Sequence, residues 1–237
     1  MNSFVSRRGV LISLAALTGG LVASELRAAA PPEESGLSSE GLLVGRPGFQ
    51  PRTVMPLPHA ELPGFLSRAQ LDAHHADYQR DVERLKETEQ ALRAGKVDGY
   101  AELRRTHVAS ANAVLLHEFY FGGLASAEVA PPRQIARHMS EHMGTFESWR
   151  DDFTRCAMAA KTWAVLVYDP YDDRWHDVVM DEDDVGVWVG ANPLLVCDVA
   201  SHAFATDYPR REDYVVKFLD RVDWEEVARR YKAVDRM

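Results

Sequence analysis

The sequence has little cysteine, no excess of basic charge and no apolar run of membrane-spanning length. Of its 237 residues only Cys156 and Cys197 are cysteines, and both have apolar neighbours. Small thiols in such surroundings are commonly buried, so we expect free cysteines rather than a disulfide. The uncharged apolar run over Gly9–Ala23 is shorter than the roughly 20 residues that a membrane-spanning helix needs.

The shortage of basic residues excludes one class of partner. The formal net charge is −9, from 27 basic and 36 acidic residues. Residues 1–30 contain three arginines and one glutamate, a net +2, so the remainder carries −9 − 2 = −11. No basic cluster stands out, which argues against nucleic acid as a partner.

The first thirty residues have the pattern of an export signal. Arg7 and Arg8 precede the short apolar run, and paired arginines at this place indicate the twin-arginine route. We expect cleavage after Ala28-Ala29-Ala30, with the mature protein in the periplasm. The alternative is a retained signal that anchors the chain to the membrane. Residues 31–52 are rich in proline and glycine and read as a flexible linker.

Periodicity predicts a helical hairpin over residues 53–129. Ser67-Arg68-Ala69-Gln70 is a capping box that begins the first helix. A second helix is expected over about Tyr100–Phe121, ended by two glycines, and the two should pack antiparallel. The inward stripe of the first helix follows helical spacing: Leu71, His74, Tyr78, Val82 and Leu85.

The pattern changes after Ala130-Pro131-Pro132, so residues 130–237 are predicted as a second domain with both helices and strands. The expected fold class is α+β: an N-terminal antiparallel helical hairpin, then a domain with a three-stranded antiparallel sheet and flanking helices. The sequence predicts the following elements: helices over about 133–142 and 146–158, strands over about 163–168, 175–180 and 194–197, and two terminal helices.

Four polar residues stand on faces that are otherwise apolar. His74 lies on the stripe of the first helix, and His117 on that of the second. Asp198 ends a hydrophobic strand, and His202 follows four residues later. Burying such groups without partners costs several kcal/mol each, and one bound ion would satisfy them all. Three imidazoles with one carboxylate suit iron or manganese, and zinc less well.

These residues carry a close resemblance to the iron/manganese superoxide dismutase family, over about residues 53–234. The strongest element is Asp198-x-x-x-His202 after its strand, and the remaining ones occur in the family's order: Leu66-Ser67 through His74-His75, Leu116–Phe121, Trp163–Asp169, Pro193–Leu195 and Val222–Glu225.

The resemblance implies a mononuclear site with one iron or manganese ion per chain and superoxide as the small-molecule substrate. The ligands it implies are His74, His117, Asp198 and His202. An alignment on the His-His-x-x-Tyr pattern would put Gln70 in the place of His74. Because Ser67 and Gln70 match the family's helix start without a gap, we favour His74.

Around the implied ligands the chain departs from the family pattern. Asp81 and Val185 stand where the family has a channel tyrosine and a solvent-binding glutamine, and Ala200-Ser201 replaces a Trp-Glu pair. Phe204 replaces a tyrosine at the subunit interface, so any homodimer should have an atypical interface. Tyr78 could supply the missing hydroxyl or could simply pack in the core.

The resemblance also implies that Trp163 lines the metal pocket, so we take Tyr78, Asp81 and Trp163 as candidate catalytic residues. Two alternatives to a dismutase stay open. One is a metal-holding protein without turnover, and the other is a redox enzyme of changed substrate that uses Asp81 to handle protons. His138 and His142, with helical spacing, and the acidic run Asp181–Asp184 are interpreted as solvated surface.

Overall fold

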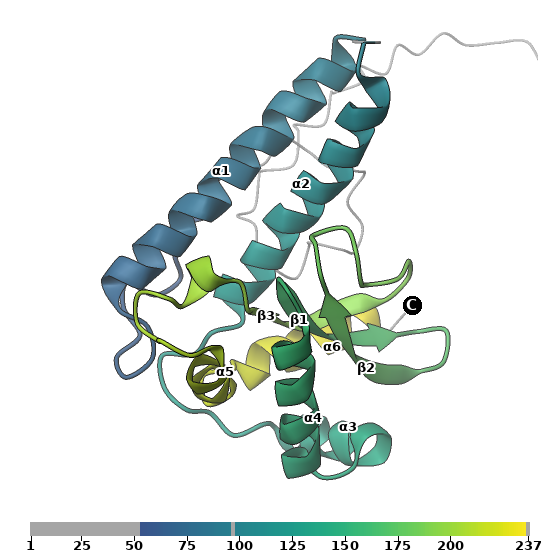
Figure 1. The fold of residues 1–237 in the computed structure, drawn as a ribbon. Helices are drawn as coiled ribbons and strands as arrows, with labels where there is room; N and C mark the ends of the chain where they lie inside the picture. The colour runs from purple at the N-terminus through teal and green to yellow at the C-terminus, as the bar shows by residue number, and fades with distance from the viewer. Residues whose placement is uncertain (1–52, 96–97, 236–237) are drawn as a thin grey trace, which may run out of the picture. The chain divides into compact units, whose positions relative to one another are not determined.

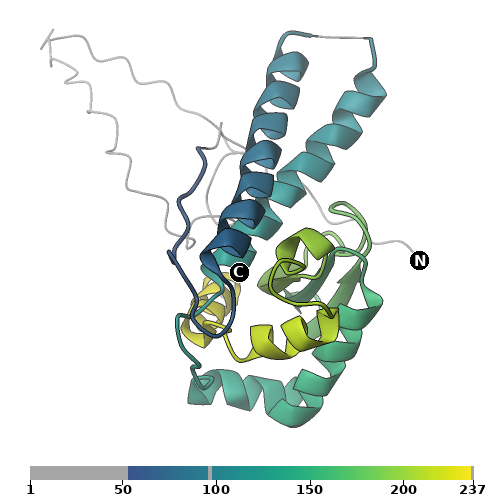
Figure 2. The same ribbon diagram turned by 60° about the vertical axis from the view of Figure 1, so that its left-hand side comes forward.

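The computed structural model describes residues 53–95 and 98–235, and Figures 1 and 2 show their arrangement. The predicted export signal and linker lie outside the described residues. Within the described part, no helix combines the length and apolar character needed to cross a membrane.

The N-terminal half is the expected hairpin of two long helices, α1 (Arg68–Arg93) and α2 (Tyr100–Gly122), which run antiparallel side by side (Figures 1 and 2). α1 begins at Ser67, whose hydroxyl accepts a hydrogen bond from the backbone nitrogen of Gln70 at 3.1 Å. The predicted apolar stripe of α1, from Leu71 to Leu85, is buried against its surroundings. Burial of this face holds the long helix in place.

The second half combines one sheet with four helices and confirms the α+β class. The helices are α3 (Arg133–Met143), α4 (Phe146–Ala159), α5 (Arg211–Leu219) and α6 (Trp224–Val234). The strands are β1 (Trp163–Asp169), β2 (Arg174–Met180) and β3 (Asn192–Asp198). They form an antiparallel sheet in the order β2-β1-β3. The described residues all fall within one compact unit, and the domain boundary predicted near residue 130 stays a prediction.

The register of the sheet fixes one end of the site. Trp163, the first residue of β1, is paired with Asp198, the last residue of β3. Val199 continues the pairing, because its backbone nitrogen donates to the carbonyl of Thr162 at 2.8 Å. A short 3-10 helix, η2 (Ser201–Ala203), follows at once. The pairing therefore places Trp163 and Asp198 side by side at one end of the strands, just before η2.

The two cysteines agree with the sequence-based expectation. Cys156 on α4 and Cys197 on β3 are both buried and free. Burial raises the pKa of the Cys156 thiol to about 12, so this thiol stays protonated and unreactive at neutral pH.

Candidate metal centre

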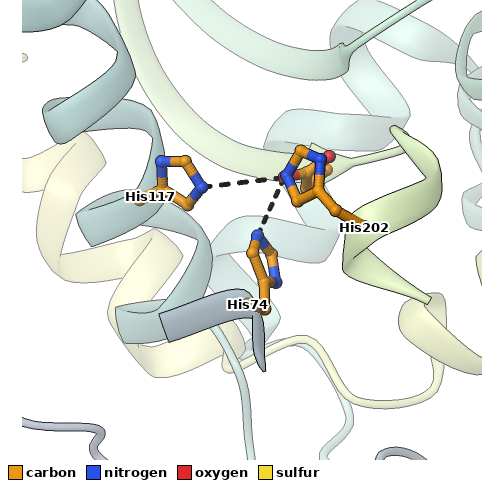
Figure 3. A group of neighbouring side chains, drawn as sticks. His74, His117 and His202 are labelled. Carbon is orange, nitrogen blue, oxygen red and sulfur yellow. Dashed lines mark hydrogen bonds and ion pairs between the residues drawn. The ribbon is translucent and has the colours of Figure 1, made fainter. Parts of the chain in front are cut away.

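Four side chains from four elements meet at one point. His74 comes from α1, His117 from α2, Asp198 from the end of β3 and His202 from η2. One ligand atom from each lies within 4.8 Å of every other. Figure 3 shows the three imidazole rings turned toward this common point. We call these four residues the ligand group.

The carboxylate of Asp198 is the centre of the group. Its Oδ2 atom lies 2.9 Å from Nε2 of His74, 3.0 Å from Nε2 of His202 and 4.0 Å from Nε2 of His117. Its Oδ1 atom accepts a hydrogen bond from the backbone nitrogen of Ala200 at 2.9 Å. That second contact fixes the carboxylate plane and keeps Oδ2 turned toward the imidazoles.

His117 shows most clearly that the group suits a cation. Its Nδ1 donates a hydrogen bond to the carbonyl of Ala113 at 2.9 Å. Because a carbonyl can only accept, Nδ1 carries the proton and Nε2 of the neutral ring has a free lone pair. Nε2 is buried and has no hydrogen-bond partner among the described residues. An ion at the centre would satisfy this orphaned nitrogen.

Burial and charge act on the group in opposite directions. Burial lowers the pKa of His117 to about 4, and burial also lowers the pKa of His74, so both rings stay neutral at pH 7. Burial opposes ionisation of Asp198, but hydrogen bonds from His202 and His74 outweigh it and lower the pKa of the carboxyl group. Two neutral imidazoles beside an ionised carboxylate are in the protonation states that metal binding requires.

Gln70, the alternative to His74, has a different task. Its side-chain nitrogen donates to the backbone carbonyl of His202 at 2.6 Å, and its side-chain oxygen accepts from the backbone nitrogen of Thr206 at 2.9 Å. The side chain is fully buried. Gln70 therefore does not reach back to complete the predicted capping box. It ties the turn that carries His202 to the start of α1.

A cavity of about 260 Å³ opens beside the ligand group. His202 is the most exposed ligand, with 41% of its side chain accessible, whereas the other three are between 0% and 3% accessible. Small molecules therefore approach from the side of His202. The cavity is lined by charged residues, which we call the charged rim, on α1 and on the loop after β2: Asp77, Arg80, Asp81, Arg84 and Asp183.

Asp81 lies where the sequence placed it, within the cavity. Its Oδ2 atom is 3.6 Å from Nδ1 of His117, and its Oδ1 atom is 3.6 Å from the Arg84 guanidinium. Burial raises the pKa of this carboxyl group to about 6. Arg80 also lines the cavity and pairs with Asp77. The carboxylates are thus partly neutralised by two arginines, which the sequence analysis did not single out.

Trp163 also lines the cavity, where it contacts Asp183 of the charged rim. The indole nitrogen of Trp163 donates to Oδ1 of Asp183 at 2.8 Å, and the side chain of Asn112 donates to the Asp183 carbonyl at 2.9 Å. The sequence interpretation was wrong to put Val185 here, because Val185 is 51% exposed and does not line the cavity. Nothing in the spacing distinguishes Asp183 from its acidic neighbours, so only the fold reveals it.

Tyr78, the candidate for the channel hydroxyl, lies in the core of the structure. Its ring is buried, and its hydroxyl donates to Glu118 at 3.0 Å and accepts from the backbone nitrogen of Met55 at 3.0 Å. It is absent from the cavity lining. The packing interpretation of Tyr78 therefore describes it better than the catalytic one. Phe204 is likewise buried within the chain, where its ring stacks on Tyr214.

The fold and the ligand group together define a class of protein: a helical hairpin joined to a three-stranded α+β half, with three histidines and one aspartate placed so that they could hold a single metal ion. Comparisons with known proteins agree. Residues 131–230 match the family described as "Iron/manganese superoxide dismutases, C-terminal domain".

Curated relatives extend the match beyond that half. "Superoxide dismutase [Mn] 2" of Haloferax volcanii is 33% identical over 164 residues, which is 68% of this chain and 82% of the relative. "Superoxide dismutase [Fe]" of Methanothermobacter thermautotrophicus is 30% identical over 194 residues, covering 76% of this chain and 93% of the relative. The chain belongs to the iron/manganese superoxide dismutase family. The relatives' names include both metals, and the ligand group offers the donors that either would use.

Proposed function

We propose that this protein is a superoxide dismutase that holds one iron or manganese ion per chain through His74, His117, Asp198 and His202. The observation that carries the proposal is the convergence of three imidazole nitrogens on one buried carboxylate oxygen, with Nε2 of His117 lacking any other partner. When bound, the ion supplies the one-electron chemistry that converts two superoxide anions and two protons into dioxygen and hydrogen peroxide.

The residues of this chain do the remaining work. His74, His117 and Asp198 exclude water from three sides of the site, because their side chains are almost inaccessible. The cavity beside His202 admits a small anion, and Arg80 and Arg84 on its rim attract it. Asp81 holds a proton more tightly than an ordinary aspartate, which suits a group that passes protons to the site.

One observation favours a second function, a metal-holding protein without turnover. Three rim carboxylates, Asp77, Asp81 and Asp183, share the cavity with two arginines. When all are ionised they leave the rim with a net negative charge, which opposes a superoxide anion. The rim charge does not alter the donor atoms of the ligand group, so the protein could bind a metal ion and still turn over superoxide slowly or not at all.

Superoxide consumption by the purified metal-loaded protein separates the two functions. We expect close to one iron or manganese ion per chain and a rate far above that of the His117→Ala variant, which should lose most of its metal. His176→Ala, a substitution distant from the ligand group, is the matched control and should keep both. Full metal content with a rate no better than that of His117→Ala would establish the metal-holding function instead.

Export and assembly are further parts of the proposal. We infer that the paired arginines direct the folded, metal-loaded chain to the periplasm. Changing Arg7 and Arg8 to lysine should then retain the protein in the cytosol, as fractionation would show. A homodimer would need an interface unlike the one that the resemblance implies, because Phe204 is used inside the chain. Sedimentation of the mature protein measures its oligomeric state directly.

A further inference from the structure

A second group of metal-binding side chains lies on α3, away from the ligand group. His138, Glu141 and His142 stand at positions i, i+3 and i+4 of this helix, so all three share one face. One ligand atom from each lies within 4.8 Å of the others. The two imidazole rings are stacked with their centroids 6.1 Å apart, at an interplanar angle of 14°.

The structure differs here from the sequence interpretation, which treated His138 and His142 as a solvated surface face. Both histidines are half-buried. The ring of His138 is held between two aromatic side chains: it stacks on Trp175 at 6.1 Å and meets the edge of Tyr231 at 4.8 Å. Its Nδ1 atom is buried and has no hydrogen-bond partner among the described residues. Because its neighbours already restrict the His138 ring, the side chain would lose little further conformational entropy on binding a metal ion.

The electrostatic setting also favours a cation. The three residues occupy the last two turns of α3, where the backbone carbonyls leave a partial negative charge. Glu141 is exposed and forms an ion pair with Arg137, whose Nε lies 3.4 Å from its Oε1. Such an exposed ion pair contributes little to stability, so a metal ion could displace it easily.

We propose that His138, Glu141 and His142 form an auxiliary site for a divalent zinc-like ion, separate from the redox centre. Two imidazoles with one carboxylate are a donor set that Zn²⁺ accepts, and exposure of Glu141 leaves room for water in the remaining position. Binding there fixes α3 against β2 and α6, the elements that supply Trp175 and Tyr231. The site therefore strengthens the half of the fold that carries Asp198 and His202, without entering the reaction.

A third group of possible ligands is less suited to an added cation than the group on α3. Asp169, Asp172 and His176 also bring ligand atoms together, at the β1–β2 turn. Their donors are already used: Asp169 accepts from the Tyr171 backbone and from Trp188, and His176 pairs with Asp172 at 3.0 Å. A cation at that turn would have to break these contacts first, whereas at α3 it breaks one weak ion pair.

The test uses the untagged full chain, loaded with its iron or manganese and then equilibrated with Zn²⁺. Elemental analysis after dialysis should show one zinc per chain, with the iron or manganese content unchanged. His142→Gln should weaken zinc binding by about tenfold or more, since loss of a mere hydrogen-bonding partner of a ligand already costs 10- to 100-fold. Glu141→Gln tests the carboxylate in the same way.

His176→Gln is the matched control and should bind zinc like the unchanged protein. Zinc should also raise the melting temperature of the wild type and of His176→Gln, but not that of His142→Gln. Absence of an additional zinc, displacement of the redox metal by it, or equal zinc affinity in the wild type and His142→Gln would each overturn the proposal. Because His142 is only half-buried, its replacement should leave the fold intact, which circular dichroism checks.

Discussion

The ligand group and the charged rim share one cavity, yet they are built on different principles. Two of the three buried ligands are held by a contact from outside the group: His117 by the Ala113 carbonyl and Asp198 by the Ala200 backbone nitrogen. On the rim, by contrast, Arg80 and Arg84 are 66% and 61% exposed and make ion pairs within their own helix. The inside of the cavity is therefore specified by geometry and the outside mainly by charge, so metal binding and catalytic rate can change independently.

The largest effect should come from the residue that holds a ligand without being one. Gln70→Ala removes both contacts to the turn that carries His202. We expect the affinity for the redox metal to fall by about 10- to 100-fold, as for other groups that orient ligands. Competition with a chelator measures it. Gln90→Ala changes an exposed position on the same helix and should bind the metal as the wild type does. An unchanged metal affinity in Gln70→Ala would contradict the view that specific contacts hold the ligands in place.

Asp177 is a half-buried carboxylate that belongs neither to the ligand group nor to the charged rim, and among the described residues it lacks the compensating contacts that Asp198 has. Asp177 on β2 accepts one hydrogen bond, from the indole nitrogen of Trp149 at 3.2 Å, and its other oxygen is buried and unpartnered in the described structure. Burial raises its pKa to about 7. Between the unfolded value near 4 and this value the folded state binds more protons, so stability decreases as pH rises through that range.

Asp177→Asn cannot ionise and should lose that dependence. Between pH 5 and pH 8 we expect the wild type to lose roughly 2 kcal/mol of unfolding free energy more than the variant. Urea denaturation at both pH values measures the difference. If the unfolding free energies of the two proteins changed equally with pH, the charge of Asp177 would have to be stabilised in the folded state, as that of Asp198 is.

The rim residue that touches the inner wall should have an intermediate effect. Asp183→Ala leaves the indole nitrogen of the buried Trp163 without its acceptor. Such an unsatisfied donor costs about 1–3 kcal/mol. Asp183→Asn keeps an oxygen acceptor and should stay close to the wild type, as should Asp184→Ala at the exposed neighbour. Chemical denaturation of the three variants decides whether the contact stabilises the fold.

The smallest effect concerns charge alone. Asp77→Asn removes a negative charge from the rim and should raise kcat/KM for superoxide by about threefold at low salt, while Arg84→Gln should lower it by a similar factor. Both changes should shrink at high ionic strength, where exposed charges are screened. Metal content should stay constant in both variants. If kcat/KM changed in the same direction in both variants, or in neither, the charge of the rim would not guide the anion.

The sequence predicted the fold and the meeting of His74, His117, Asp198 and His202 at one point, because both rest on strong local patterns. Helical and strand periodicities identified the hairpin and the three strands to within about two residues. His117 and Asp198 stood out because a polar residue inside an apolar run needs a partner. Family likeness then fixed His74 over Gln70, and the structure places the two accordingly.

The rim could not be predicted in the same way. Asp183 is one of four consecutive acidic residues, and its bond to Trp163 depends on how the loop after β2 folds back over β1. The error at Val185 has this origin, since a shift of two residues in a loop leaves no trace in periodicity. The packing of His138 against Trp175 and Tyr231 is also invisible in sequence, because it joins three separate elements.

Arg230 on α6 has a consequence for how the protein is made. Its buried guanidinium donates to the backbone carbonyls of Leu194 on β3 and Phe119 on α2, at 2.9 and 3.0 Å. Those two elements supply Asp198 and His117. A chain truncated before α6 would lack these two hydrogen bonds, so the centre should mature only after α6 has left the ribosome. Metal acquisition would then act as a check that synthesis has reached α6.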